Sequence, residues 1–321
     1  MDIISLIEEQ VKRIRELSHD LALEKVVIHI NRAEKYYCLG KESGDDAYFT
    51  DVIYRTNQAF EGSLRQAYKV LAGKTEKQAN AKRTVDIETY FASSGIFKPR
   101  VLRLFQNYRQ EWRNESVHDF QLFFDENEAF LAIVNVSAYS NLLFSQIIER
   151  LAFLNEQRLL MEEKNKRKRI VDGFNDGNRL IDKIVNIIKV FSIENELLES
   201  NPSESEIIGA FSAVLTSASK DIVIEAELAI KVGSMSYRPD LVIKYKDEKI
   251  IVEVKRFWDA KSMGNEEQVL RYLNVSNIEN GILWYPKNYP SEKLMNIEEM
   301  LHWGRDANIV VTISPLEFFD H

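Results

Sequence analysis

The chain has 321 residues, which exceeds one typical domain, so its length predicts two domains. Hydrophobic residues make up 45% of it and charged residues 29%, a composition that excludes extended disorder. The formal net charge of -8 excludes a general attraction to nucleic acid, so local basic patches or metal ions would have to meet such a partner.

The cysteine content and the hydropathy pattern predict a cytoplasmic protein. Cys38 is the only cysteine, which excludes an intramolecular disulfide and a cysteine-based zinc site and fits a reducing compartment. The first twenty residues have the pattern of an amphipathic helix rather than a signal peptide. No apolar run approaches the ~18 residues of a membrane span, so we expect no membrane association.

Residues 1–160 carry mainly helical periodicity and predict an all-α bundle. Gly73 stands where a C-cap glycine ends the third expected helix, and Pro99 is a favoured first-turn residue of the next. Between these two positions, residues 74–95 predict a looser segment. The expected helices cover residues 3–17, 19–39, 45–73, 99–112 and 126–160.

A change in composition then marks a domain boundary. Residues 164–169 contain five Lys or Arg, so we place a basic linker at 161–177, which is either a phosphate-contacting patch or a solvated helix end. Residues 178–321 have the pattern of an α/β domain. Its expected helices cover 178–191, 203–219 and 264–274, and its expected strands cover 222–230, 240–245, 250–257, 281–285 and 309–313.

The stretch "SYRPDLVIKYKDEKIIVEVKR", residues 236–256, predicts a β-hairpin that carries several charges. With a turn centred on residues 247–248, Asp240 lies opposite Lys255, and strand alternation places Glu253 on the same face. The three charges therefore converge, provided that the register holds. The opposite face is apolar and suited to packing on helices: Leu241, Ile243, Val252 and Val254.

Two carboxylates this close raise each other's pKa unless a cation lies between them. Mg²⁺ suits the position, because it prefers hard oxygen ligands such as two carboxylates, a strand carbonyl and a substrate phosphate. A metal-bound water becomes a nucleophile, and Lys255 can orient that water or offset the charge that develops on the phosphate. The alternative is a surface hairpin with solvated ion pairs that contribute ~0–1 kcal/mol.

This pattern resembles the PD-(D/E)XK motif of the restriction-endonuclease-like nuclease superfamily, over roughly residues 178–315. The resemblance implies an α/β domain with a mixed sheet that cuts DNA with Mg²⁺ or Mn²⁺. It assigns Asp240, Glu253 and Val254 to the metal, the first two also to catalysis, and Lys255 to catalysis.

In this family an upstream helix often supplies a further acidic ligand, and some branches carry a Gln-x-x-x-Tyr element near the DNA strand. Glu206 matches the acidic ligand here, with Glu204 as an alternative. Gln268 and Tyr272, four residues apart on one helical face, match the second element and are expected to contact nucleic acid. The alternatives are a solvent-facing glutamate and a tyrosine packed on its own core.

The helical half contains a second candidate site in "QEWRNESVHDF", with Arg113, Asn114 and His118. This arrangement resembles the R-x4-6-H motif of HEPN domains, over about residues 20–155. The resemblance implies metal-independent RNA cleavage between two protomers, with His118 as general acid or base, Arg113 as phosphate clamp and Asn114 as a further donor to RNA. Many members carry Tyr two residues after the His, where this chain has Phe120. The alternative is an arginine paired with neighbouring glutamates.

The first functional hypothesis is a metal-dependent endonuclease that cuts DNA through its second domain. Its HEPN-like domain forms a homodimer, with RNA cleavage as a further role, and analogy with two-nuclease proteins suggests prokaryotic antiviral defence with partner proteins of that system. A second hypothesis is a HEPN ribonuclease whose α/β domain binds nucleic acid without cutting. A third is a non-catalytic interaction protein.

Overall fold

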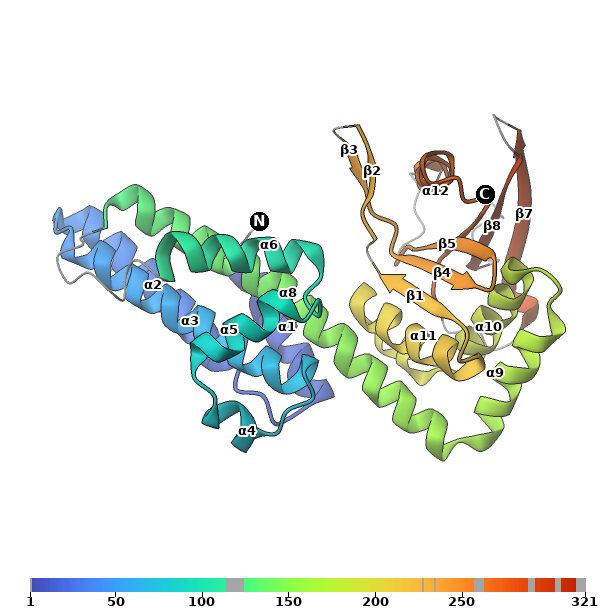
Figure 1. The fold of residues 1–321 in the computed structure, drawn as a ribbon, viewed down its shortest axis with the longest axis horizontal. Helices are drawn as coiled ribbons and strands as arrows, with labels where there is room; N and C mark the ends of the chain where they lie inside the picture. The colour runs from blue at the N-terminus through green and yellow to red at the C-terminus, as the bar shows by residue number, and fades with distance from the viewer. Residues whose placement is uncertain are drawn as a thin grey trace. The chain divides into compact units, whose positions relative to one another are not determined.

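The structure is a computed structural model that describes residues 2–113, 124–226, 228–233, 235–256, 263–287, 292–303 and 307–315. It divides into two compact units, Met1–Leu151 and Ala152–His321. The first unit is helical, and the second combines helices with a mixed sheet of six strands (Figure 1). The predicted fold class, a helical bundle followed by an α/β domain, is therefore confirmed.

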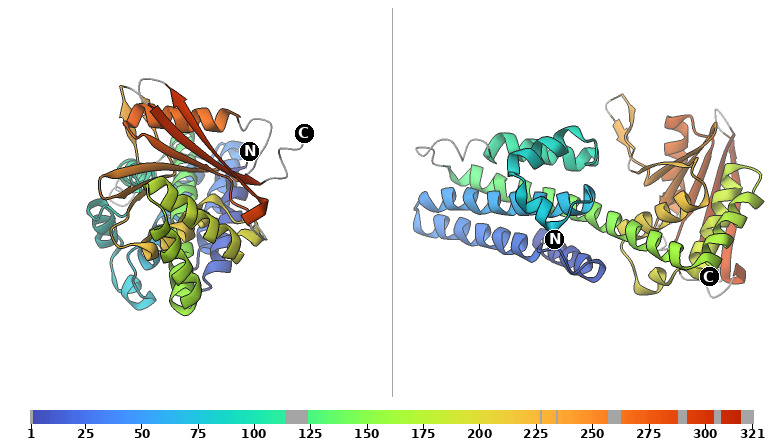
Figure 2. Two further views of the ribbon diagram at one scale, coloured as in Figure 1. Left: turned by 90° about the vertical axis from the view of Figure 1, so that its right-hand side faces the viewer. Right: turned by 60° about the horizontal axis from the view of Figure 1, so that its bottom comes forward.

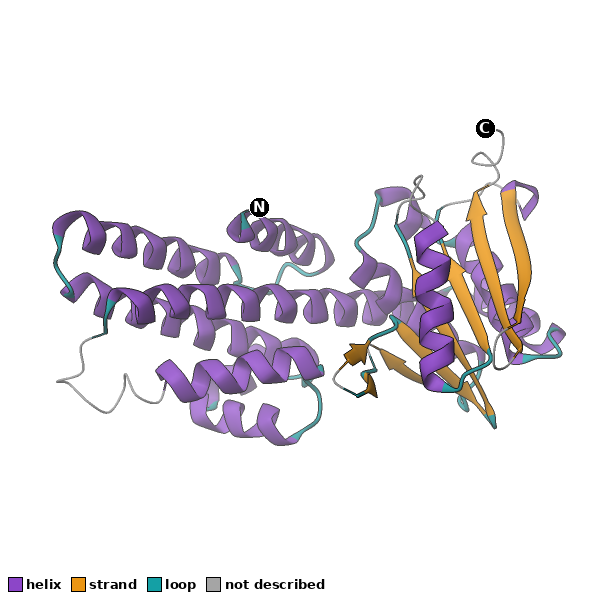
Figure 3. Cartoon of the chain, turned by 90° about the horizontal axis from the view of Figure 1, so that it is seen from above, coloured by secondary structure: helices purple, strands orange, loops and turns teal. Residues whose placement is uncertain are grey.

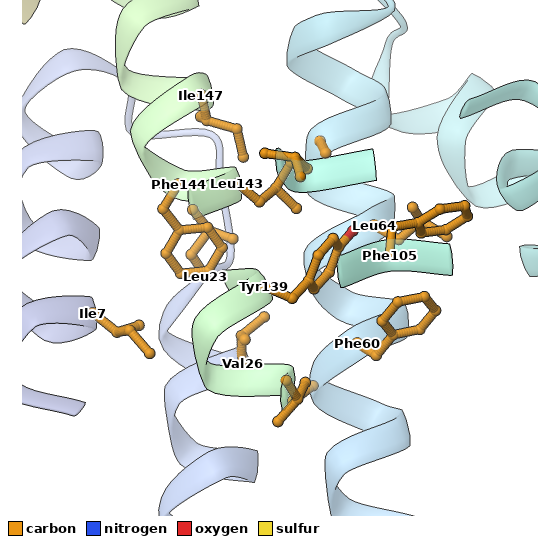
Figure 4. Packing of buried hydrophobic residues seen from close by; sticks show 14 of the residues in the cluster. Ile7, Leu23, Val26, Phe60, Leu64, Phe105, Tyr139, Leu143, Phe144 and Ile147 are labelled. Carbon is orange, nitrogen blue, oxygen red and sulfur yellow. The ribbon is translucent and has the colours of Figure 1, made fainter. Parts of the chain in front are cut away.

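The helical unit packs around one long apolar helix. Tyr139 of that helix lies among Phe60 and Phe105, with ring centroids 5.2 Å and 6.4 Å away (Figure 4). Burying aromatic side chains of this size supplies much of the hydrophobic stabilisation of a bundle. The elements are α1 (Ile3–Leu17), α2 (Glu24–Ser43), α3 (Ala47–Leu71), α4 (Glu76–Ala81), α5 (Thr84–Ser93), α6 (Pro99–Tyr108), the π-helical turn η1 (Arg109–Arg113) and α8 (Glu126–Glu162).

The segment expected to be looser, residues 74–95, instead contains α4 and α5. The side chain of Thr75 accepts a hydrogen bond from the Gln78 N–H and the side chain of Gln78 accepts one from the Thr75 N–H, which is a capping box that starts α4. Ile87 and Phe91 of α5 are buried in the core of the unit. Both helices are short, so tertiary packing rather than periodicity defines them.

α8 corrects the prediction that no apolar run approaches the length of a membrane span. One window of this helix has a mean hydropathy of 1.4, so length and composition alone would allow it to cross a membrane. However, 56% of that window is buried inside the protein, as in the central helix of a bundle.

The second unit begins with helices and continues with the sheet. Its elements are α9 (Lys164–Asp176), α10 (Leu180–Glu194), the 3-10 helix η2 (Glu196–Ser200), α11 (Glu204–Ala218), β1 (Val223–Ala226), β2 (Ile230–Val232), β3 (Met235–Tyr237), β4 (Leu241–Tyr245), β5 (Glu248–Val254), α12 (Met263–Ser276), β6 (Asn280–Trp284), the 3-10 helix η3 (Glu292–Leu294), β7 (Met295–Trp303) and β8 (Ala307–Pro315).

The six-stranded sheet has the order β1-β4-β5-β6-β8-β7. β5, β6 and β8 are parallel, and the other neighbouring pairs are antiparallel. Helices α10 and α11 pack on one face and α12 on the other (Figures 1 and 3). α12 approaches β6 closely at Gly281, where an added Cβ would lie 2.6 Å from Val269 Cγ1. β2 and β3 form a separate two-stranded ribbon.

The segment expected to be a basic linker, residues 161–177, is largely the helix α9, packed on α10 and α11. Lys166 is buried, with its Nζ 3.0 Å from Glu156 Oε1, and Arg169 pairs with Glu194. Asn195 Nδ2 donates to the other oxygen of Glu156 at 2.9 Å. Part of the basic run therefore neutralises acidic side chains of the same unit.

Candidate active site

The site lies where β4 begins and β5 ends. The observed register pairs Leu241 with Val252, and the two strands join through a two-residue turn at residues 246–247. Asp240, just before β4, is therefore opposite Glu253, and the predicted pairing with Lys255 is wrong by two residues. Because side chains alternate with a period of two, this shift leaves all three charged side chains on the predicted face.

The two faces of the hairpin have the predicted characters. The apolar side chains of Leu241, Ile243, Val252 and Val254 are buried in the core formed with α10 and α11. On the opposite face α12 packs against the strands, so the charged residues lie beside this helix and not on an open surface. The exposed fraction of Glu253 is 2%. The alternative of a solvated hairpin with surface ion pairs does not describe this site.

Short hydrogen bonds connect the charged residues. The Val254 N–H donates to Asp240 Oδ2 at 2.7 Å, and the Asp240 N–H donates to Glu253 Oε2 at 3.2 Å. Lys255 Nζ donates to Glu253 Oε1 at 2.7 Å. The backbone amide of Val254 therefore fixes the orientation of Asp240, a contact for which side-chain patterning gave no signal.

Burial raises the pKa of both carboxyl groups. The pKa of Asp240 rises from its ordinary 3.8 to about 8, first through burial and then through the charges of Glu253 and Glu204. Burial also raises the pKa of Glu253, although Lys255 counteracts the change. Without a further cation, this pocket favours protonation of Asp240 near neutral pH.

Lys255 remains an ammonium ion in this pocket. Burial alone would lower its pKa, but the hydrogen bond to Glu253 and the charges of Glu253 and Asp240 outweigh burial and raise it. A permanently protonated amine cannot accept a proton from water. Its charge can, however, stabilise a negatively charged group.

α12 supplies a second support for Glu253. Gln268 Nε2 donates to Glu253 Oε1 at 2.8 Å and lies 2.5 Å from the hydroxyl oxygen of Tyr272. Burial raises the pKa of Tyr272, and its ring contacts that of Tyr237 with centroids 6.3 Å apart. The structure thus brings the predicted Gln268 and Tyr272 to the hairpin, where their observed contacts orient Glu253.

Glu206 and Glu204 have different surroundings. Glu206 is buried, and its Oε2 accepts hydrogen bonds from the Ser203 N–H and hydroxyl at 2.6 Å each, so this carboxylate caps the start of α11. Glu204 is exposed, and its charge raises the pKa of Asp240 and of Lys255. The alternative ligand Glu204 is thus the one with an electrostatic effect on the hairpin.

The donor set at the hairpin fits a divalent cation. Asp240 and Glu253 offer hard oxygen atoms that lie close together on one face of the hairpin. A cation there would also counteract the raised pKa of Asp240, because its positive charge favours the ionised carboxylate. The described part of the chain contains no group of three His, Cys, Asp or Glu placed to hold a metal, so the ion would depend on these two carboxylates, backbone carbonyl, water and substrate.

The predicted site in the helical unit is described only at Arg113. Asn114 and His118 lie outside the described residues. Arg113 Nε is 2.9 Å from Oε1 of Glu88, which is buried in α5, and Arg113 Nη2 is 3.9 Å from Glu61 Oε1. The sequence gave no signal for the pairing with Glu88, because α5 itself was not predicted. Arg113 thus forms ion pairs, as in the alternative, but its partners belong to α3 and α5 and are not the glutamates next to it in the sequence.

Comparison with known proteins identifies part of the second unit. Residues 210–295 match the family model of the PD-(D/E)XK nuclease superfamily. The matched segment runs from α11 to the start of β7 and includes Asp240, Glu253 and Lys255. The helical unit is not identified as a HEPN domain, and no curated protein or solved structure matches the chain. The match supports a nuclease domain, which implies nucleic-acid binding, and nucleases of this superfamily typically use divalent metal ions.

Proposed function

We propose that the second unit is an Mg²⁺-dependent endonuclease that hydrolyses phosphodiester bonds in DNA. The observation that carries this proposal is the meeting of Asp240, Glu253 and Lys255 on one face of the β4–β5 hairpin, inside the segment that matches the nuclease family. Without a bound cation, placing the buried Glu253 and the partly buried Asp240 and Lys255 together is costly, because burial disfavours all three charges.

The contacts of these side chains indicate a different role for each of them. Asp240 and Glu253 would hold the ion together with the carbonyl of Val254. When bound, the ion supplies a Lewis acid for a phosphate oxygen and a water of lowered pKa. Lys255 offsets the negative charge that develops on the phosphate, because its amine stays protonated. Gln268 holds Glu253 in place through its hydrogen bond to Oε1.

A metal series on the purified full chain tests the proposal. Covalently closed circular DNA, linear duplex, single-stranded DNA and RNA are each incubated with Mg²⁺, with Mn²⁺ and with EDTA. We expect Mg²⁺ to support cutting of circular DNA, which requires an endonuclease, and EDTA to abolish it. Lys255→Ala should remove the activity, whereas Lys249→Gln, at the exposed turn end of β5, should retain it. Cutting that survives EDTA or Lys255→Ala contradicts the proposal.

For the helical unit, we propose a HEPN-like module that forms the homodimer. Its possible RNA cleavage through Arg113, Asn114 and His118 is the second candidate function, and it requires that Arg113 exchange its ion pair with Glu88 for a phosphate. RNA cleavage in EDTA that is lost in His118→Ala would establish this activity. Light scattering of the full chain tests the dimer. Absence of all cleavage and of nucleic-acid binding would favour the interaction protein.

The cellular setting is part of the same proposal. A nuclease domain joined to a HEPN-like module is similar to prokaryotic defence proteins, so we place the protein in the cytoplasm, in antiviral defence, with partner proteins of that system. Protection of cells from phage that depends on Lys255 would support this setting. Equal phage sensitivity with the wild-type and Lys255→Ala proteins would contradict it.

A further inference from the structure

The β2–β3 ribbon projects from the sheet on the side where α12 lies (Figures 1 and 2). It joins β1 to β4 and returns the chain to the active site, since Asp240 follows β3 by three residues. Its register pairs Ile230 with Tyr237 and Lys231 with Ser236. Lys231 and Ser236 are exposed, while Ile230 and Tyr237 are partly buried. The ribbon thus has one face for packing and one face toward solvent.

The base of the ribbon is tied to the catalytic hairpin. Ile230 and Tyr237 pack on the cluster formed by α12 with β4 and β5. The ring of Tyr237 lies edge-on to that of Tyr272, which contacts Gln268, the donor to Glu253. Residues at the end of β3 therefore hold a fixed position relative to the catalytic carboxylates.

Arg238 directly follows β3, and no described residue pairs with its side chain. Its side chain is partly buried, and its Nε is buried with no hydrogen-bond or ion-pair partner among the described residues. Two other arginines of this unit have partners: Arg179 pairs with Asp182 and Glu299, and Arg256 donates to Asn201. A buried donor without an acceptor is costly, and a bound ligand can supply the missing acceptor.

Pro239 restricts how Arg238 can move relative to Asp240. The proline ring fixes its own φ, and it also disfavours the helical region for the preceding residue. Arg238 is thus held two residues from a catalytic carboxylate. Its planar guanidinium matches a phosphate with two parallel hydrogen bonds, and it adds positive charge two residues along the chain from a carboxylate that would repel a nucleic-acid backbone.

We propose that Arg238 binds a backbone phosphate of the substrate strand, next to the phosphodiester that Asp240 and Glu253 face. This inference rests on the proposed nuclease function and adds a substrate-binding site on the ribbon side of the hairpin. The β2–β3 ribbon serves as the support that holds the arginine in place through Ile230 and Tyr237.

Binding of fluorescent DNA and RNA oligonucleotides, measured by anisotropy in EDTA over a range of salt concentrations, tests this site without cleavage. Arg238→Gln should raise Kd about 10- to 100-fold, the loss expected for a hydrogen bond between charged groups. It should also reduce the slope of log Kd against log salt by about one phosphate contact, roughly 0.9 for duplex DNA. Arg238→Lys should keep the slope and recover only part of the affinity.

Lys249→Gln is the matched control, because it removes one positive charge at the exposed far end of β5 and should leave Kd and slope unchanged. An unchanged Kd and slope for Arg238→Gln, with or without a fall in its melting temperature, overturns the inference. If that variant fails to fold, the affinity of Arg238→Lys decides, and a wild-type Kd overturns the inference.

Mg²⁺-dependent cleavage by the same samples separates the two proposals. Wild-type cleavage together with unaltered binding by Arg238→Gln overturns the role of Arg238 alone. A wild-type protein that neither binds nor cuts any of these nucleic acids overturns the proposed function and, with it, the inference.

Discussion

Asp240→Asn separates the charge of Asp240 from its hydrogen bond. An asparagine oxygen can still accept from the Val254 N–H that now donates to Asp240 Oδ2. Burial, with the charges of Glu253 and Glu204, raises the pKa of Asp240 to about 8. A carboxyl group whose pKa rises on folding destabilises the fold as the pH increases, because the unfolded chain loses the proton that the folded chain retains. The metal-free Asp240→Asn protein should therefore be more stable than wild type.

The size of this effect follows from the pKa change. At about pH 7 the carboxyl group is ionised in the unfolded chain, where its pKa is the ordinary 3.8. In the folded chain, where its pKa is about 8, most molecules still carry the proton. This difference costs the folded state at most about 4 kcal/mol at ~1.36 kcal/mol per pH unit. Lys255 and relaxation of the protein reduce this cost. We therefore expect Asp240→Asn to gain about 2–4 kcal/mol of stability, or roughly 5–15 °C in Tm for a unit of this size. The gain should vanish below about pH 4.

Calorimetry of the full chain in EDTA, between about pH 4 and pH 9, measures this gain in the transition of the second unit. Asp247→Asn, at the exposed hairpin turn, serves as the control and should behave like wild type. Adding Mg²⁺ at about 100 times its Kd should then stabilise wild type by ~2.7 kcal/mol but not Asp240→Asn. Equal melting temperatures of wild type and Asp240→Asn at about pH 9 would refute this account of the buried carboxyl group.

Four further substitutions test other contacts of the second unit. Glu204→Gln should lower the pKa of Asp240 and move the pH dependence of Mg²⁺ binding to lower pH, whereas Glu206→Ala should cost about 1 kcal/mol of stability in urea without moving it. Gln268→Ala should weaken Mg²⁺ binding about 10- to 100-fold in calorimetric titrations, and unchanged affinity would show that its hydrogen bond does not position the carboxylate. Gly281→Ala should cost about 1–3 kcal/mol in urea unfolding, since its Cβ would lie 2.6 Å from a side chain of α12.

The amino-acid sequence by itself determined which side chains share a face of each strand. Strand alternation predicted that Asp240, Glu253 and Lys255 lie on one face. The turn begins one residue earlier than expected, which shifts the pairing by two residues. Because this shift is an even number, the three side chains still lie on the same face. Helical periodicity likewise predicted α1, α3 and α8. Such patterns are local, so they survive errors in the position of a turn.

Only the tertiary structure decided which groups meet across long distances in the chain. The contact of Gln268 with Glu253, the electrostatic effect of Glu204 in place of Glu206, and the pairing of buried Lys166 with Glu156 all depend on how separate elements pack. The short helices α4 and α5 also form through such contacts, because few residues carry their local pattern, and the edge strand β7 forms by pairing with β8. The same packing removes water from the hairpin, and burial, which the sequence does not display, raises the pKa of Asp240.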